Sequence, residues 1–431
     1  MCKFLLCFAL LSLVTSPVRA ENEDLIRIIN EQAELIRILE KRVLALENAR
    51  SQTVSSEALQ KPEVTQPASV KATATGQVSP SLRFRGRLQV DGGTFFDTEV
   101  SRELNSGMAF RRSRIGVLGA LPGEFDYQLL LDFADGEKVK FDDSFIRYKG
   151  WKYADLTAGQ HKVYHSLDSA TSDIYVPFME RSIVSNAFEA GAGGKLGISA
   201  FSKGTDWTLH IGFMTDSANR TAQEEDGWGL NARTTWSPFH ESGRVLHFGA
   251  SYYYREESEK AVSFSAGPGL KVGNSAIVGS GRIPMSSYRV AGLEFAAVAG
   301  PASLQGEYNR ADVMALGSKE NPEFWGGSVA ATYSLTGEPR TYSAGSGAFG
   351  RTVPARDVKD GGPGALELAA RFSYLDLEDA GQGQRLEDIT LGINWIPVDH
   401  VRLMVNYLYF KTLGAESWSG QGIGFRAQAD W

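Results

Sequence analysis

Three arginines stand at every second position near the start of a long alternating region. Arg83, Arg85 and Arg87 are separated by single apolar or small residues, which is the spacing of one face of a β-strand. Side chains two positions apart on a strand are about 6.6 Å from each other. Guanidinium groups in such a row can pass a phosphate or carboxylate from one set of donors to the next, and they stay charged. The row therefore indicates contact with anions.

A second basic cluster occupies residues 111–114. If Ile115 faces away from the polar side, Arg112 and Arg114 share the polar face and Arg111 falls at the rim. The alternative is that the arginines of both clusters only pair with carboxylates on the same polar surface. The acidic residues in position to do so are Asp91, Asp126, Asp132 and Asp143.

The elements that must position these arginines are β-strands. From residue 82 onward, short segments alternate apolar and polar residues between Gly, Asp, Asn and Pro turns. This alternation, with 46 glycines and 11% aromatic residues, is typical of a transmembrane β-barrel with a polar lumen. We predict an all-β barrel of about 16 antiparallel strands over residues 81–431. A soluble β-sandwich is the alternative, but each apolar face would need a second sheet to cover it.

The final segment of the chain shows the two faces clearly. Ile423, Phe425 and Trp431 lie on one side, and Arg426 lies on the other. In a closed barrel the last strand pairs with the first. We therefore expect Arg426 to face the same lumen as the first arginine row, with the apolar side toward lipid.

The connections predict the two ends of the barrel. Short turns are expected at residues 121–124, 203–206, 299–301 and 396–399, and long loops at the opposite end over 215–226, 256–287 and 336–364. The connection 160–186 is too long for a turn and carries much apolar surface, which predicts a constriction loop folded into the pore. Its candidate pore residues are His161, Lys162, Tyr164, Asp173, Tyr175 and Phe178.

The N-terminus predicts export. Lys3, the apolar run 4–14 and a small residue at Ala20 form a secretory signal peptide over residues 1–20. Cys2 and Cys7 are the only cysteines of the chain, so the mature protein is expected to lack disulfides and thiolate sites. No later apolar run is long enough for a spanning helix.

Residues 21–48 predict a helix with a coiled-coil seam. Leu25, Ile29, Ile36 and Leu39 follow spacings of four and three, with a polar break at Gln32. The expected partner is a further copy of the same chain; a lone amphipathic helix on a surface is the alternative. Residues 49–80 are rich in Ser, Thr, Ala, Gln and Pro and predict a flexible linker.

The charge and the motifs of the sequence argue against several classes of function. The formal net charge is -7, so nothing favours nucleic-acid binding. The six histidines show neither Gly-x-Ser-x-Gly nor metal-ligand spacing, although His161 and His165 stand four apart. We therefore expect no enzyme activity, no metal and no cofactor.

Several segments resemble the phosphate-selective porins O and P of Gram-negative outer membranes. They follow the family's order and together span about residues 82–431. The matching segments are 84–91 (FRGRLQVD), 110–116 (FRRSRIG), 132–136 (DFADG), 145–148 (FIRY), 178–181 (FMER), 303–308 (SLQGEY), 334–338 (SLTGE), 367–377 (ELAARFSYLDL) and 401–407 (VRLMVNY).

The resemblance implies an outer-membrane homotrimer of sixteen-stranded barrels and diffusion of anions, phosphate or polyphosphate first, through an arginine-lined channel. Arg111 and Arg112 match the family's basic pair at the constriction. The chain departs from the family at residues 172–175, where phosphate-specific members tend to carry a basic residue, and the barrel is net acidic. The candidate arginines of the anion path are Arg83, Arg85, Arg87, Arg111, Arg112, Arg114, Arg147, Arg181 and Arg426.

A second hypothesis is structural. The chain is then a general, weakly selective porin whose periplasmic coiled coil also tethers the outer membrane to peptidoglycan or to a periplasmic protein.

Overall fold

A computed structural model describes residues 80–96, 104–134, 136–188, 194–220, 226–272, 276–317, 320–379, 383–414 and 417–431, together with Lys41. The predicted signal peptide, coiled-coil helix and linker lie outside the described residues, apart from Lys41 and Pro80. They stay predictions.

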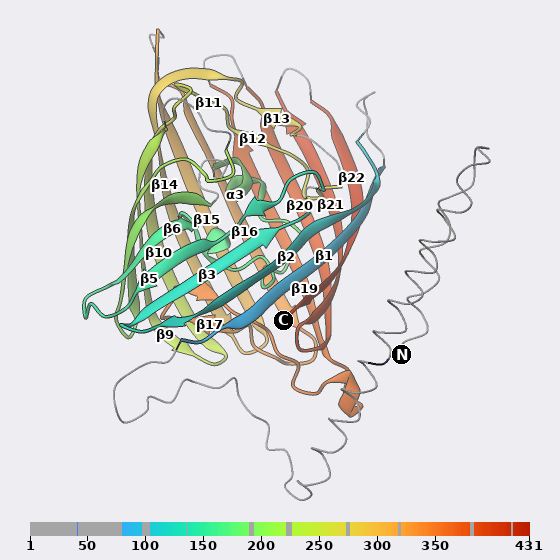
Figure 1. Ribbon diagram of the computed structural model, residues 1–431. Coiled ribbons are helices and arrows are strands. Elements are labelled where there is room, and N and C mark those ends of the chain that lie inside the picture. The colour runs from blue at the N-terminus through green and yellow to red at the C-terminus, as the bar shows by residue number, and fades with distance from the viewer. Residues whose placement is uncertain are drawn as a thin grey trace, which may run out of the picture. The chain divides into compact units, whose positions relative to one another are not determined.

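The described chain forms a closed antiparallel barrel of 16 strands, as the alternation predicts (Figure 1). Each strand pairs with its neighbours along the chain, and the last pairs with the first, with Asp91 opposite Arg426. The strands are β1 (Arg83–Phe96), β2 (Gly107–Leu121), β3 (Phe125–Asp132), β5 (Ser144–Tyr148), β6 (Asp155–His161), β7 (Lys195–Lys203), β8 (Trp207–Met214), β9 (Trp228–Glu241), β10 (Arg244–Glu256), β14 (Ile283–Ala299), β15 (Ala302–Ala315), β16 (Glu323–Ser334), β19 (Ala365–Asp376), β20 (Arg385–Val398), β21 (Val401–Leu413) and β22 (Ser419–Asp430).

The two faces of the wall separate as expected. On β20, Ile389, Leu391 and Ile393 are exposed outward, while Thr390 and Asn394 are buried toward the lumen. The same alternation places Phe425 outside and Arg426 inside on β22. Strand side chains alternate with period two, so each strand offers one face to lipid and one to the interior.

Short turns gather at one end of the barrel, called the turn end below. They include 122–124, 204–206, 300–301 and 399–400, which confirms the predicted set. Gly123 and Glu124 both have positive φ, 77° and 64°, as a tight hairpin connection requires. The opposite end is called the loop end.

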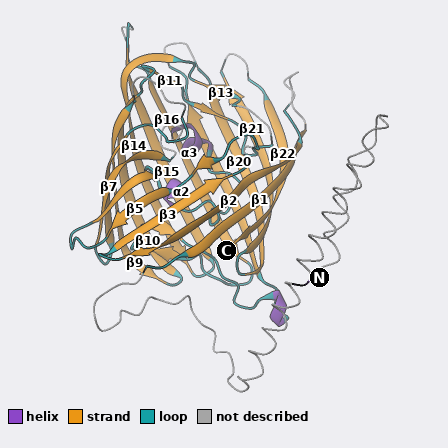
Figure 2. Ribbon diagram, in the orientation of Figure 1, coloured by secondary structure: helices purple, strands orange, loops and turns teal. Residues whose placement is uncertain are grey.

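Three long connections fold into the barrel. The inner loop, residues 162–194, carries α2 (Leu167–Ala170) and α3 (Ile183–Phe188), which lie within the ring of strands in Figure 2. Residues 257–282 enter from the loop end and carry β11 (Ala261–Val262), β12 (Ser265–Ala266) and β13 (Val278–Gly279). Their Phe264 packs against Phe188 in the main buried cluster. The described residues contain no helix long and apolar enough to cross a membrane.

The third connection corrects a prediction. Residues 335–364 were expected among the long loops opposite the turns, but they join β16 to β19 at the turn end, where Ser334 N donates to Pro301 O at 2.9 Å. They carry β17 (Tyr342–Ser343), β18 (Ala348–Phe349) and η1 (Val358–Asp360). The prediction assumed that all long connections between strands lie at the loop end. Here part of the extra length folds into the barrel, where Phe349 packs against Leu167 of α2.

β4 (Lys140–Phe141) extends the ladder of β3, and the wall is uneven in height. β3, β5, β6, β7 and β8 have 8, 5, 7, 9 and 8 residues, whereas β14 has 17 and β2 has 15. The part of the wall from β3 to β8 is called the short wall below.

Candidate functional site: the barrel lumen

The inner loop is bonded to the barrel wall on both sides. Asp168 N donates to Glu307 Oε1 on β15 at 2.6 Å. On the far side, Met179 N donates to Asn406 Oδ1 at 2.7 Å, and Asn394 Nδ2 donates to Pro177 O at 2.8 Å. A segment tied to β15, β20 and β21 crosses the lumen. The predicted inward-folded loop is therefore present.

One carboxylate of this loop contacts three of the predicted arginines. Asp173 Oδ2 lies 2.6 Å from Arg112 Nε and 3.8 Å from an Arg114 terminal nitrogen. Arg87 donates to Asp173 Oδ1. Arg114 also contacts Asp132 at 2.7 Å and Asp142. The like charges of the arginine clusters are thus relieved mainly by acids of the protein itself.

A second carboxylate holds two further arginines. Glu180 accepts from Arg111 Nε at 2.6 Å and from its terminal nitrogen at 3.0 Å. Arg426 donates to both oxygens of Asp91, at 2.6 and 2.7 Å, and reaches Glu180 at 3.2 Å. Arg426 thus lies on the same side of the wall as Asp91 of the first strand.

The alternation had predicted that Arg111 lies at the rim. In the structure it does not. The register of β1 and β2 shifts between Gln89 and Val90, whose partners are Arg112 and Phe110, so Arg111 occupies a β-bulge. A bulge places one extra residue on one strand and redirects its side chain. Both Arg111 and Arg112 therefore reach the lumen, although they are adjacent.

The remaining predicted arginines have other surroundings. Arg83 is exposed at the start of β1, and Arg85 donates to Gln128 Oε1 at 3.0 Å. Arg181 donates to carbonyl oxygens of its own loop, among them Asp168 O at 2.8 Å. Arg147 donates to Thr157 Oγ1 at 3.2 Å. The nine arginines thus do not form one continuous row.

The two loop carboxyls remain ionised despite their burial. Burial favours the neutral form of Asp173, but Arg112, Arg87 and Arg114 outweigh it and hold its pKa well below the usual range. Burial likewise opposes ionisation of Glu180, and Arg111 and Arg426 lower its pKa below the ordinary value. These charges act as fixed anchors for the loop.

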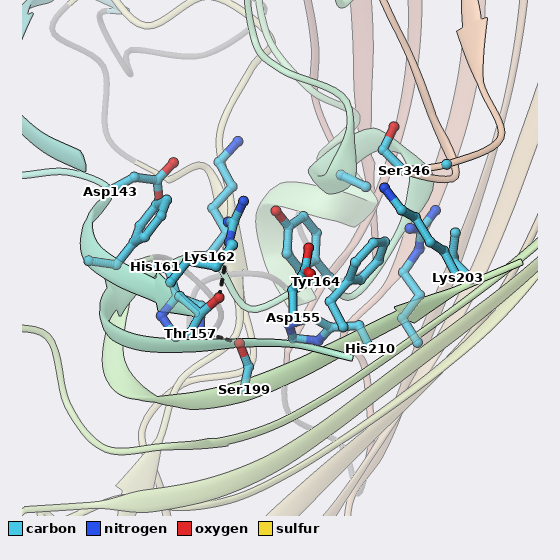
Figure 3. A pocket seen from close by; sticks show the side chains of 17 residues that line it. Asp143, Asp155, Thr157, His161, Lys162, Tyr164, Ser199, Lys203, His210 and Ser346 are labelled. Carbon is cyan, nitrogen blue, oxygen red and sulfur yellow. Dashed lines mark hydrogen bonds between the residues drawn. The ribbon is translucent and has the colours of Figure 1, made fainter. Parts of the chain in front are cut away.

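A cavity of about 270 Å³ remains beside the inner loop, against the wall from β5 to β9 (Figure 3). Among the described residues no carboxylate lies within ion-pair distance of three of its four cations, Arg147, Lys162 and Lys203, whereas Arg233 pairs with Glu294. Asp143 and Asp155 also line it. Figure 3 shows Lys162 and Tyr164 beside the cavity, and the hydrogen bond from His161 to Ser199 as a dashed line.

A second cavity of about 320 Å³ lies next to the first along the wall. It is lined by Gln160, Asp142 and Lys195, while the neighbouring residues His161 and Asp143 line the first cavity. Together the two spaces follow the short wall toward the loop end.

The comparisons with known proteins agree with this architecture. Residues 82–428 match the sequence model of the family described as phosphate-selective porin O and P. An uncharacterised protein of Caulobacter vibrioides is 32% identical over 378 residues, covering 82% of this chain and 75% of that protein. Porin O of Pseudomonas aeruginosa is 27% identical over 387 residues, covering 79% of this chain and 85% of that porin.

The chain belongs to the phosphate-selective porin O and P family. The solved trimer form of OmpT from Vibrio cholerae has the same fold, with a TM-score of 0.54 at 14% identity, covering 82% of this chain and all of that one. Family and fold identify an outer-membrane porin, a channel rather than an enzyme.

The predicted constriction residues of this porin have separate surroundings. His161 contacts Ser199 at 2.8 Å, whereas His165 contacts Asn309 at 3.0 Å, so the two histidines share no site. Phe178 is buried under the guanidinium of Arg371, 4.5 Å from its ring centroid. The ring of Tyr175 lies 5.3 Å from the guanidinium of Arg351. Only His161, Lys162 and Tyr164 of the predicted loop set line the first cavity.

Sequence reasoning missed several pore-lining groups of this porin. Lys203 was assigned to a turn, and it ends β7 with its side chain at the cavity. His210 lies on the buried face of β8 and also lines the cavity. The alternation of β8 was a sufficient signal that His210 faces the lumen. Nothing in the sequence showed that this part of the lumen is the part left open.

Proposed function

We propose that this porin passes small anions by diffusion along the wall from β5 to β9, over Arg147, Lys162 and Lys203. The observation that carries the proposal is that these three cations line a lumen cavity and have no carboxylate partner among the described residues. A fixed charge that is not neutralised sets which ions enter a water-filled pore. The arginines bound to Asp173 and Glu180 serve chiefly to hold the inner loop.

Phosphate is the first solute to test, because the family description names it. Asp143 and Asp155 face the same cavity, so the preference for anions should be moderate. The tethering alternative depends on residues 21–48, outside the described part of the chain, and no observation favours it.

Reversal potentials of the purified protein in a planar bilayer with a KCl gradient test the proposal. The expected reading is anion preference, reduced or reversed by Lys162→Glu combined with Arg147→Glu. Lys152→Glu, in the exposed turn after β5, is the matched control and should leave the potential unchanged. A cation-selective reading of the unmodified protein would refute the anion path.

We propose further that the porin assembles as a homotrimer through the short wall. Five residues of β5 span about 17 Å along the strand, and less along the barrel axis because strands tilt. The apolar band of an outer membrane is about 25 Å tall. An outer-face hollow of about 530 Å³, lined by Ile146, Ile198 and Ile211, lies on this wall. A further copy would cover it, and the OmpT relative includes a trimer form.

A further inference from the structure

A row of rings lines the first cavity, that of about 270 Å³, between β5 and β8. The rings of Tyr164 and His210 meet edge to face with centroids 4.8 Å apart, and Phe201 lies 6.5 Å from the same imidazole. On the other side, Phe145 faces His161 at 6.4 Å. Rings offer stacking and edge-to-face contacts to a flat apolar solute, but they cannot replace the water around a small inorganic anion.

Arg147 stands within this row. Its guanidinium carbon lies 4.7 Å from the ring centroid of Phe145, and its Nε donates to Thr157 Oγ1 at 3.2 Å. Its two terminal nitrogens have no hydrogen-bond partner in the described part of the chain. A guanidinium held on one side by a ring and a hydroxyl therefore presents two parallel donors, the arrangement that binds a carboxylate in bidentate fashion.

His210 supplies a second polar group. Its side chain is buried, and its Nδ1 contacts Asn231 Nδ2 at 3.1 Å. Its Nε2 has no hydrogen-bond partner among the described residues. A buried ring nitrogen left without a partner costs free energy unless water or a solute meets it.

We infer that this cavity binds small aromatic carboxylates, with the carboxylate on Arg147 and the ring against Tyr164 and Phe201. The inference rests on the proposed anion path, because the solute must first be admitted as an anion. The volume of about 270 Å³ is below the range of about 300–1,000 Å³ for drug-sized ligands, so it suits a one-ring solute. Inorganic phosphate would contact the cations but would gain no binding energy from the rings.

Block of the chloride current by added solutes tests the inference on the full-length protein in planar bilayers. Benzoate, acetate and phosphate are compared by the concentration that halves the current. We expect a concentration about tenfold lower for benzoate than for acetate or phosphate, which corresponds to about 1.4 kcal/mol. Acetate carries the same carboxylate without the ring. Equal concentrations for benzoate and acetate would overturn the inference.

A variant pair separates the ring contact from general effects. Phe201→Ala should raise the benzoate concentration to that of acetate. Phe372→Ala, on the exposed outer face of β19, is the matched control and should behave as the unmodified protein. If Phe201→Ala fails to assemble, the solute comparison on the unmodified protein decides alone. Anion preference with no benzoate advantage defeats only this inference, whereas cation preference defeats the anion path.

Discussion

Asp173 and Arg112 form an ion pair inside the barrel, with Oδ2 of the carboxylate 2.6 Å from Nε of the guanidinium. The carboxylate belongs to the inner loop and the arginine to β2, so this pair joins the loop to the wall. Arg87 and Arg114 contact the same carboxylate. One acidic residue therefore decides both where the loop lies and how much positive charge the lumen presents.

Asp173→Asn should increase anion selectivity and lower thermal stability. Removing one partner of a buried ion pair leaves the other charge uncompensated, at a cost of about 3–5 kcal/mol. Reversal potential and melting temperature measure the two effects. Asp399→Asn, at an exposed turn, is the control and should change neither by much. An unchanged reversal potential in Asp173→Asn would show that these arginines do not face permeating ions.

The conductance and the melting temperature should stay nearly constant as the pH falls from about 7 to about 4.5. Free carboxyl groups titrate near pH 4, but arginines hold the pKa of Asp173 and of Glu180 below that range. A lowered pKa means that the stability from these pairs is present above the unfolded pKa and lost only as pH falls toward the folded one. A marked change between pH about 6 and about 5 would contradict these ion pairs.

Replacing residues 341–350 by a short Gly-Ser linker should raise the single-channel conductance. Within this stretch, Tyr342 bonds to His247 at 2.5 Å, and Gly347 O accepts from Arg233 at 2.7 Å. Gly345 and Ser346 line the first cavity, that of about 270 Å³, so their removal widens it at the turn end. The matching replacement of residues 353–362, most of which are exposed, is the control. Equal conductance in both variants would exclude the segment as a constriction.

Ile198→Arg should dissociate the oligomer, whereas Leu391→Arg should leave it intact. Ile198 lies on the short wall and Leu391 on β20 of the taller wall, and both are exposed on the outer face. A charge facing lipid costs about 2–4 kcal/mol at mid-membrane, so both variants should lose stability. Measuring the mass of the assembly in mild detergent shows which of the two variants dissociates. The short wall is not the contact surface if both variants keep the same assembly.

Much of the barrel follows from the sequence because strand alternation is a local property. The inward and outward faces of β20 and β22, the sixteen strands and the short turns all depend on residues one or two positions apart. The position of Arg426 needed only one further rule, that a closed barrel pairs its last strand with its first.

The environment of each lumen charge was decided by tertiary structure. Asp173 is 86 positions from Arg87 and Glu180 is 246 from Arg426, and no local pattern connects them. The bulge at Arg111 depends on the register of two strands, and the inward path of residues 335–364 depends on the apolar surface of α2. The sequence by itself determined which face of each regular strand turns to the lumen. Only the loops that cross that lumen decided which charges are neutralised and where space remains, because those contacts form between distant parts of the chain.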